Sequence, residues 1–201
     1  MKSLVNKIEK ELVVEKSRFI AMLFPLTSES DVKSLLDTVK REHPDARHIP
    51  YAYRYGDKSR ASDDGEPSGS AGRPLLDLLT KKELDQVLLV VVRYFGGVLL
   101  GAGRLLRTFS LAGKEAIAAA EWAELVEDRG YRVILSYENF ENLKRLARET
   151  GAMLTDIVYN DKVAATLYSD TLLASDLLSR FSGAIVINEL ASQRRLKPHK
   201  E

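Results

Sequence analysis

Three carboxylates stand within four residues of the chain, at Asp63, Asp64 and Glu66. Such a cluster could bind Mg²⁺ weakly, or it could supply the acid and base of a hydrolase. The alternative is a solvated loop whose charges face water. A nucleophile with its own base is missing, because the chain has no cysteine, has three scattered histidines and shows no Gly-x-Ser-x-Gly motif around Ser68 and Ser70. We therefore expect no catalytic residue, no metal ion and no cofactor, and a binding protein is favoured over an enzyme.

Positive charge gathers around a glycine-rich turn. Between residues 86 and 114 the chain contains no acidic residue and four basic ones: Arg93, Arg104, Arg107 and Lys114. The glycines of the turn are Gly96, Gly97, Gly101 and Gly103. Two of these arginines fall on the first turns of a predicted helix, where the helix dipole is positive, so a bound anion would relieve their repulsion. The alternative is that they pair with the loop carboxylates. The two interpretations are compatible, because a loop carboxylate could occupy the anion site until a phosphate displaces it.

The spacing of these glycines does not support nucleotide binding. Gly96 and Gly101 have the separation of a phosphate-binding loop, but Ala102 and Gly103 stand where Lys and Ser or Thr are required. The dinucleotide fingerprint also fails, because Leu106 occupies its third glycine position. What remains is an anion site made of backbone amides and arginines.

The composition is that of an ordinary globular protein. The 201 residues are 45% apolar and carry a net charge of +1, which excludes a basic field over the whole molecule. The absence of cysteine favours a reducing compartment. The longest apolar run, at residues 87–92, is far shorter than the roughly 20 residues of a membrane span. We expect a cytoplasmic protein with no membrane partner.

The N-terminal part is predicted to form mixed elements around one buried strand. Apolar periodicity and capping residues predict a hairpin at 11–14 and 18–23, a helix over 31–43, a strand at 51–55, a helix at 75–82, a strand at 87–92 and a helix at 102–121. Gly113, inside the last helix, indicates close packing there. Residues 56–74 fit no regular element and are predicted to be a functional or disordered loop.

The chain changes character near residues 127–130, and we place a domain boundary between 1–127 and 128–201. The second part is predicted to have a strand at 131–137, a helix at 139–150, strands at 153–159 and 163–168, a helix at 172–181 and a strand at 185–190. Gly183 is expected to stop the second helix, and the basic tail from Gln193 is expected to be loose. The order βαββαβ is that of a ferredoxin-like domain.

Five motifs in this order resemble signatures of the IMPACT/YigZ family. They are KSRFI at 16–20, YAY at 51–53, SDDGEPSGSAG at 62–72, VVRYFGG at 91–97 and LGAG at 100–103. The motif loop contains Asp63, Asp64, Gly65, Glu66, Pro67, Ser68, Gly69 and Gly72. The resemblance implies an α+β fold of two domains, the first like domain 2 of ribosomal protein S5 and the second like domain V of elongation factor G. Arg104 departs from the pattern, since the family typically has glycine there.

The resemblance and the basic turn together predict an RNA- or ribosome-associated protein that regulates translation. RNA phosphates would be bound by Arg73, Arg93, Arg104, Arg107 and Lys114, with Tyr94 as a stacking surface. One alternative is a hydrolase that uses Asp63, Asp64 and Glu66. Another is a protein-interaction module that acts on translation regulators, because eukaryotic relatives act in translational control.

Overall fold

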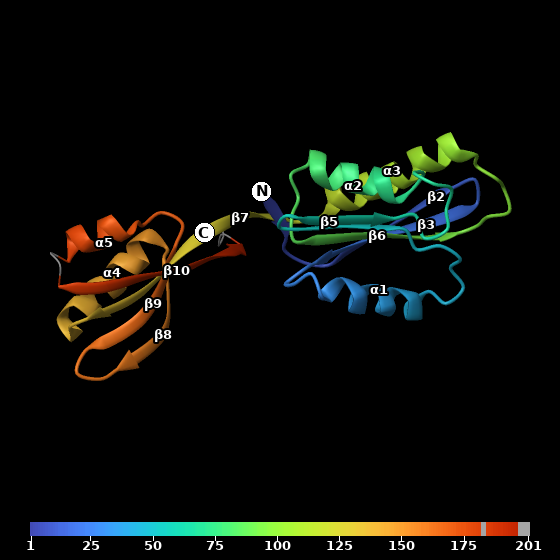
Figure 1. Cartoon of the computed structure of the whole chain (residues 1–201). Coiled ribbons are helices and arrows are strands. Elements are labelled where there is room, and N and C mark those ends of the chain that lie inside the picture. The colour runs from blue at the N-terminus through green and yellow to red at the C-terminus, as the bar shows by residue number, and fades with distance from the viewer. Residues whose placement is uncertain (182–183, 197–201) are drawn as a thin grey trace. The chain divides into compact units, whose positions relative to one another are not determined.

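The structure, a computed structural model, describes residues 1–181 and 184–196 and divides into two compact units (Figure 1). The first unit runs to Glu124 and the second begins at Leu125. Strand β7 (Trp122–Leu135) passes through this junction, and the boundary expected after residue 127 falls slightly later on the same strand. The stop expected at Gly183 and the tail beyond residue 196 lie outside the described residues. Within them, no helix is long and apolar enough to cross a membrane.

The first unit is built on a five-stranded antiparallel sheet in the order β2-β3-β6-β4-β5. Its strands are β2 (Ile8–Val14), β3 (Ser17–Pro25), β4 (Tyr51–Tyr55), β5 (Lys58–Ser62) and β6 (Val87–Tyr94). The central strand is β6. Its side chains from Val87 to Val92 are all fully buried, which explains why this strand is one continuous apolar run.

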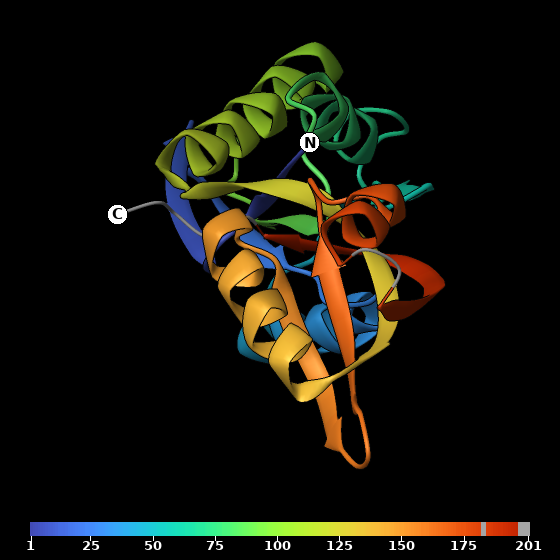
Figure 2. The same ribbon diagram turned by 90° about the vertical axis from the view of Figure 1, so that its left-hand side faces the viewer.

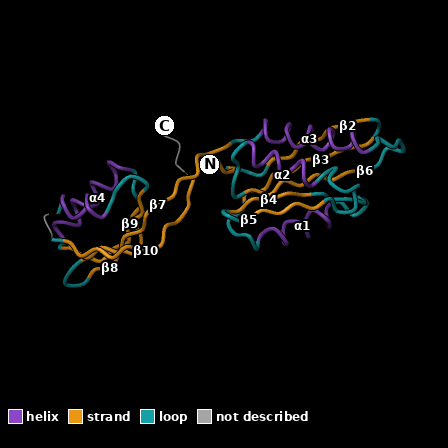
Figure 3. Tube along the Cα trace, turned by 45° about the horizontal axis from the view of Figure 1, so that its top comes forward, coloured by secondary structure: helices purple, strands orange, loops and turns teal. Residues whose placement is uncertain are grey.

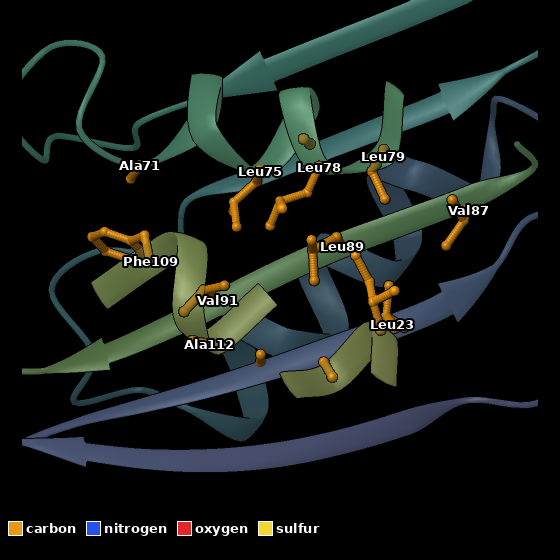
Figure 4. Close-up of a cluster of buried hydrophobic side chains, with 14 of the residues drawn as sticks. Leu23, Ala71, Leu75, Leu78, Leu79, Val87, Leu89, Val91, Phe109 and Ala112 are labelled. Atoms are coloured by element: carbon orange, nitrogen blue, oxygen red, sulfur yellow. The ribbon is translucent and has the colours of Figure 1, made fainter. Parts of the chain in front are cut away.

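Helices cover both faces of this sheet. Two of them, α2 (Gly72–Lys81) and α3 (Ala102–Ala119), lie on one face, and α1 (Asp31–Glu42) lies on the other (Figure 3). An apolar core lies on each face of the sheet. Alternate side chains of β6 pack into one core or the other, because successive residues of a strand point to opposite faces. Leu89 and Val91 pack under α2 and α3, whereas Leu88 and Val90 pack against α1. Figure 4 shows the first of these cores, in which Leu75, Leu78 and Leu79 of α2 meet Phe109 and Ala112 of α3.

Gly113 permits the close contact of α3 with its neighbours, as expected. A Cβ atom at this position would lie 2.9 Å from Cδ1 of Leu78 and 3.1 Å from Cδ2 of Leu75, both on α2. The two helices accordingly lie side by side (Figure 2).

One expectation about the first unit is wrong, and one of its strands has no counterpart among the expected elements. Residues 56–74 are not one irregular loop, because Lys58–Ser62 form β5 and α2 already begins at Gly72. This leaves 63–71 as the loop. The N-terminus also forms an unexpected strand, β1 (Lys2–Leu4), which pairs antiparallel with residues 122–124 of β7. Neither segment has apolar alternation, and both are strands because a partner strand offers them hydrogen bonds.

The second unit has the expected element order βαββαβ. After β7 come α4 (Tyr137–Thr150), β8 (Met153–Tyr159), β9 (Val163–Ser169), α5 (Ala174–Arg180) and β10 (Ile185–Leu196). The strands form an antiparallel sheet in the order β10-β7-β9-β8. Residues 193–196 pair with β7, so this part of the tail is not loose. The observed architecture is thus α+β in two units.

Candidate nucleic-acid interface

Strand register brings four separate segments to one end of the first unit. Arg18 of β3 pairs with Tyr94 of β6, so the β2–β3 turn lies beside the segment after β6. Tyr51 of β4 pairs with both Val90 of β6 and Ser62 of β5, so the segments before β4 and after β5 lie there too. We call this region the glycine-turn end and define it as residues 15–16, 43–50, 63–71 and 95–107, including the first turns of α3. These segments lie at the right-hand side of the first unit in Figure 1.

Glu66 and Arg93 form a buried ion pair within this region. Nη1 of Arg93 donates to both carboxylate oxygens of Glu66, each at 2.8 Å. The side chain of Glu66 is 1% exposed and that of Arg93 is 11% exposed. The guanidinium carbon also lies 5.7 Å from the ring centroids of Phe19 and Phe95. Arg93 therefore connects the motif loop to the sheet, and its positive charge is paired with a buried carboxylate.

Asp63 organises the loop through backbone hydrogen bonds. Its carboxylate accepts from the amides of Gly69, Ala71 and Gly72, at 2.8, 3.0 and 2.8 Å. Burial opposes ionisation of this carboxyl, but the three amides outweigh that effect, and the pKa of Asp63 lies below its ordinary value. Because Gly72 is the first residue of α2, Asp63 also satisfies an amide at the start of that helix.

Asp64 connects the loop to the segment before β4. Its Oδ2 accepts a hydrogen bond of 2.7 Å from the amide of Ile49, and its carbonyl oxygen lies 2.7 Å from Nδ1 of His48. Gly65 adopts a positive φ of 87°, and a Cβ atom there would lie 2.9 Å from the His48 ring. Pro67 and Ser68 are exposed at the tip of the loop.

The three carboxylates are therefore not a free acidic cluster. Each carboxylate accepts hydrogen bonds from other groups of the protein, and no donor is shared between them. Among the described residues, no group of three or more His, Cys, Asp or Glu side chains is arranged to hold a metal ion. The hydrolase hypothesis thus finds no unengaged pair of carboxylates in this loop.

The glycine turn packs tightly on the β2–β3 turn. The amide of Gly96 donates to Oγ of Ser17 at 3.0 Å, and a Cβ atom on Gly96 would lie only 2.1 Å from the carbonyl carbon of Lys16. Gly97 and Gly101 adopt positive φ values of 85° and 73°, which L side chains rarely adopt. Gly103 has no comparable restriction and lies in the exposed first turn of α3.

The structure does not bring all of the predicted phosphate-binding residues together. Arg104 lies at the glycine-turn end and pairs with Glu15 at 2.7 Å, both side chains being exposed. Arg107 lies one turn further and makes no hydrogen bond or ion pair within the described part of the chain. Arg73 instead pairs with Asp77 on α2. Lys114 lines a different groove, together with Lys2, Leu78, Lys82, Leu84, Ile117, Ala118 and Trp122.

Tyr94, predicted as a stacking surface, is half-buried and already contacts two side chains. Its hydroxyl lies 2.8 Å from Nδ1 of His43, and the guanidinium of Arg18 lies 5.4 Å from its ring centroid. The exposed aromatic ring of this region belongs to the next residue, Phe95, which is 50% exposed.

The structure adds residues that the sequence patterns did not single out. A cavity of about 180 Å³ opens at the glycine-turn end and is lined by Arg47, His48, Glu66, Arg93, Phe95 and Leu99. Arg47 is exposed and has no ion-pair partner among the residues described. Nothing in the sequence around Arg47 predicts that it lies at this cavity. It lies there because the register of β4 with β5 and β6 brings the segment before β4 to this end of the sheet.

The fold and this end of the sheet define a two-unit α+β protein with a glycine-turn surface of arginine and apolar side chains. Residues 15–117 match the family model of the Impact N-terminal domain. YvyE of Bacillus subtilis, an IMPACT family member, is 36% identical over 166 residues, which cover 80% of this chain and 75% of that protein. YigZ of Escherichia coli is 41% identical over 109 residues, covering 52% of this chain and 53% of YigZ. A crystal structure of a hypothetical protein matches with a TM-score of 0.70 and 25% identity, over 94% of this chain and 97% of that one. The chain belongs to the IMPACT family.

Proposed function

We propose that the protein associates with RNA or the ribosome and regulates translation, and that RNA phosphates are bound at the glycine-turn end. The observation that carries this proposal is that three exposed arginines lie at the glycine-turn end. Arg104 and Arg107 are on the first turns of α3, and Arg47 lines the cavity that Leu99 also lines. That helix has no acidic residue in its first turn and no side-chain cap at Gly101, and residues 101–104 are exposed, so its positive dipole end is open to an anion. Family membership adds support, because eukaryotic relatives act in translational control.

The structural resemblances support the same function by analogy of fold. The strand order β10-β7-β9-β8 is the arrangement expected of a ferredoxin-like domain, so we propose that the second unit is like domain V of elongation factor G. We likewise propose that the first unit is like domain 2 of ribosomal protein S5. Both comparisons are with components of the translation apparatus, although fold alone does not determine function.

A salt titration tests the phosphate site. A fluorescein-labelled single-stranded RNA would be titrated with the protein at several salt concentrations, beside the triple variant Arg47→Ala, Arg104→Ala, Arg107→Ala. Each phosphate contact on a single strand contributes about 0.7 to the slope of log K against log salt, so losing three contacts should reduce the slope by about 2. The matched control is Arg73→Ala with Lys114→Ala, which removes cations elsewhere on the same unit. Absence of binding at low salt, or an equal loss of slope in the control, would refute the phosphate site.

A second candidate function is supported by apolar exposure at the same end. Phe95, Val98, Leu99 and Leu106 are between 41% and 87% exposed, and exposed apolar clusters favour protein contacts. This arrangement suits an interaction module that acts on a translation regulator. A pull-down with and without nuclease separates the two candidates. A partner that survives nuclease treatment would favour the interaction module, and a partner lost with the RNA would favour the first proposal.

A further inference from the structure

We propose that Phe95 and the cavity beside it accept one unpaired base of an RNA strand, so that the glycine-turn end selects single-stranded over duplex RNA. The inference rests on the proposed function and adds to it the form of the RNA and the residue that reads it. Phosphate contacts alone would bind either form, and they therefore leave this selection open.

The Phe95 ring is both exposed and held in place. Half of its surface is open to solvent, while the Arg93 guanidinium lies 5.7 Å from its centroid. That cation is itself fixed by Glu66, so the ring contacts a rigid neighbour. An aromatic ring that is already positioned loses little conformational entropy when a base stacks on it.

The size of the adjoining cavity favours one group of a longer chain over a free metabolite. Its volume of about 180 Å³ lies below the roughly 300–1,000 Å³ of typical small-molecule sites. Leu99, which is 87% exposed, forms part of its rim. A flat base that stacks on Phe95 and enters this space would remain attached to a strand outside it.

The polar groups of the cavity match the edge of a base. Nδ1 of His48 lies 2.7 Å from the carbonyl oxygen of Asp64, which can only accept, so neutral His48 carries its proton on Nδ1. The other ring nitrogen, Nε2, is then a hydrogen-bond acceptor. Arg47 supplies unpaired donors at the same cavity. Donors and acceptors in one small space suit a base edge, whereas a purely apolar side chain would leave them unsatisfied.

A base can use this cavity only when it is outside a duplex. In double-stranded RNA the bases are stacked and paired, and the helix presents mainly phosphates and hydroxyl groups. A cavity beside the ends of the β-strands cannot reach a paired base without opening the helix. Single-stranded RNA pays no such cost, so it should gain the stacking energy in full.

The test compares Phe95→Ala with Leu99→Ala, which removes exposed apolar surface of the same cavity but no ring. The probes are one labelled single-stranded RNA and the same strand annealed to its complement. Stacking of a base on an aromatic ring is worth about 1–3 kcal/mol, so Phe95→Ala should weaken single-strand binding by about 5- to 150-fold. It should leave the salt slope and the duplex affinity unchanged, and Leu99→Ala should change the single-strand affinity by less than about threefold.

A fluorescent variant gives an independent readout. The chain has one tryptophan, Trp122, so Phe95→Trp combined with Trp122→Phe places the only indole at the proposed stacking position. Single-stranded RNA should quench its emission and should bind at least as tightly as it binds the wild type. A lack of quenching at saturating RNA would overturn the inference.

The outcomes separate this inference from the proposed function. Arginine-dependent binding of RNA that is equally weakened by the two single variants, or that is the same for duplex and single strand, overturns the base site and leaves the phosphate site standing. Absence of any RNA binding overturns both. Urea midpoints of all variants, compared with wild type, confirm that they are folded.

Discussion

Nη1 of Arg93 donates to both carboxylate oxygens of Glu66 at 2.8 Å, across 27 residues of sequence. This pair joins the central strand to the motif loop, and both side chains are largely shielded from water, Glu66 almost completely. The sequence alone predicts a phosphate contact for Arg93 and a metal-binding or acid/base role for Glu66, because it does not show that the two side chains meet. Their pairing turns both of them into supports for the surface that Arg47, Phe95 and Arg107 present.

Removing one member of this pair should destabilise the first unit strongly. Glu66→Gln or Arg93→Met leaves a buried charge without its partner, and such a loss typically costs about 3–5 kcal/mol. The double variant removes both charges and should be less destabilised than the sum of the single variants. Urea unfolding measures all three. Single variants within about 1 kcal/mol of wild type would show that the pair is solvated and does not hold the loop.

Releasing Arg104 should strengthen RNA binding. Glu15 pairs with Arg104 at 2.7 Å and neutralises it, so Glu15→Gln should raise RNA affinity at low salt and steepen the salt slope by up to about 0.7. Because both side chains are exposed, stability should change by less than about 1 kcal/mol. Glu11→Gln is the matched control, since Glu11 pairs with Arg18 and not with a proposed contact. An equal gain from both variants would indicate a general charge effect.

Two glycines of the turn should respond in opposite ways to alanine. Gly96→Ala would place Cβ 2.1 Å from the Lys16 backbone, so the turn must shift, and we expect a loss of more than about 3 kcal/mol or failure to fold. Gly103→Ala meets only the end of the Arg107 side chain, at 3.8 Å, and should stabilise α3 by up to about 1 kcal/mol. Thermal unfolding of the pair checks the prediction. Similar midpoints would mean that the packing of the turn is looser than this geometry requires.

The elements that were predicted correctly are those whose own residues determine them. The apolar run of β6 and the stripe of α1 carry their burial pattern in the sequence, and the second unit alternates elements of clear period. β5 (Lys58–Ser62) was missed because its residues, KSRAS, include no large apolar side chain and show no apolar alternation. It forms because β4 offers a ladder of hydrogen bonds, and this information is not local.

The sequence identifies a basic stretch beside the glycines, but it does not show which of its side chains share one surface. Charge counting found the basic stretch beside the glycines, and Arg104 and Arg107 do lie there. Counting charges cannot assign partners, so it predicts an exposed cation at Arg93, whereas this side chain contacts a carboxylate 27 residues away. Lys114 was included because it is near in sequence, but it lies on the far turns of α3. Arg47 and the exposure of Phe95 depend on strand register, which no local pattern reveals.

Acid should weaken the motif loop through Asp63. The pKa of this carboxyl is lower in the folded protein than in the unfolded chain, where the ordinary value is 3.8. A depressed folded pKa means that the ionised carboxylate stabilises the fold above about pH 3.8, and that this contribution is lost as pH falls through the folded value. Asp63→Ala leaves three amides without their acceptor and should cost about 1–3 kcal/mol at pH 7.

The pH dependence of that cost distinguishes a charge effect from simple packing. The difference in unfolding free energy between wild type and Asp63→Ala should be constant from pH 7 to about 5 and should shrink below about pH 4. Asp31→Ala, at the start of α1, is a positive control for this loss at low pH. Hydrogen bonds from the Thr27 hydroxyl and from Ser28 lower the pKa of Asp31 from 3.8 to about 2. A difference for Asp63 that stays constant down to pH 2 would show that the three amides do not depend on the charge.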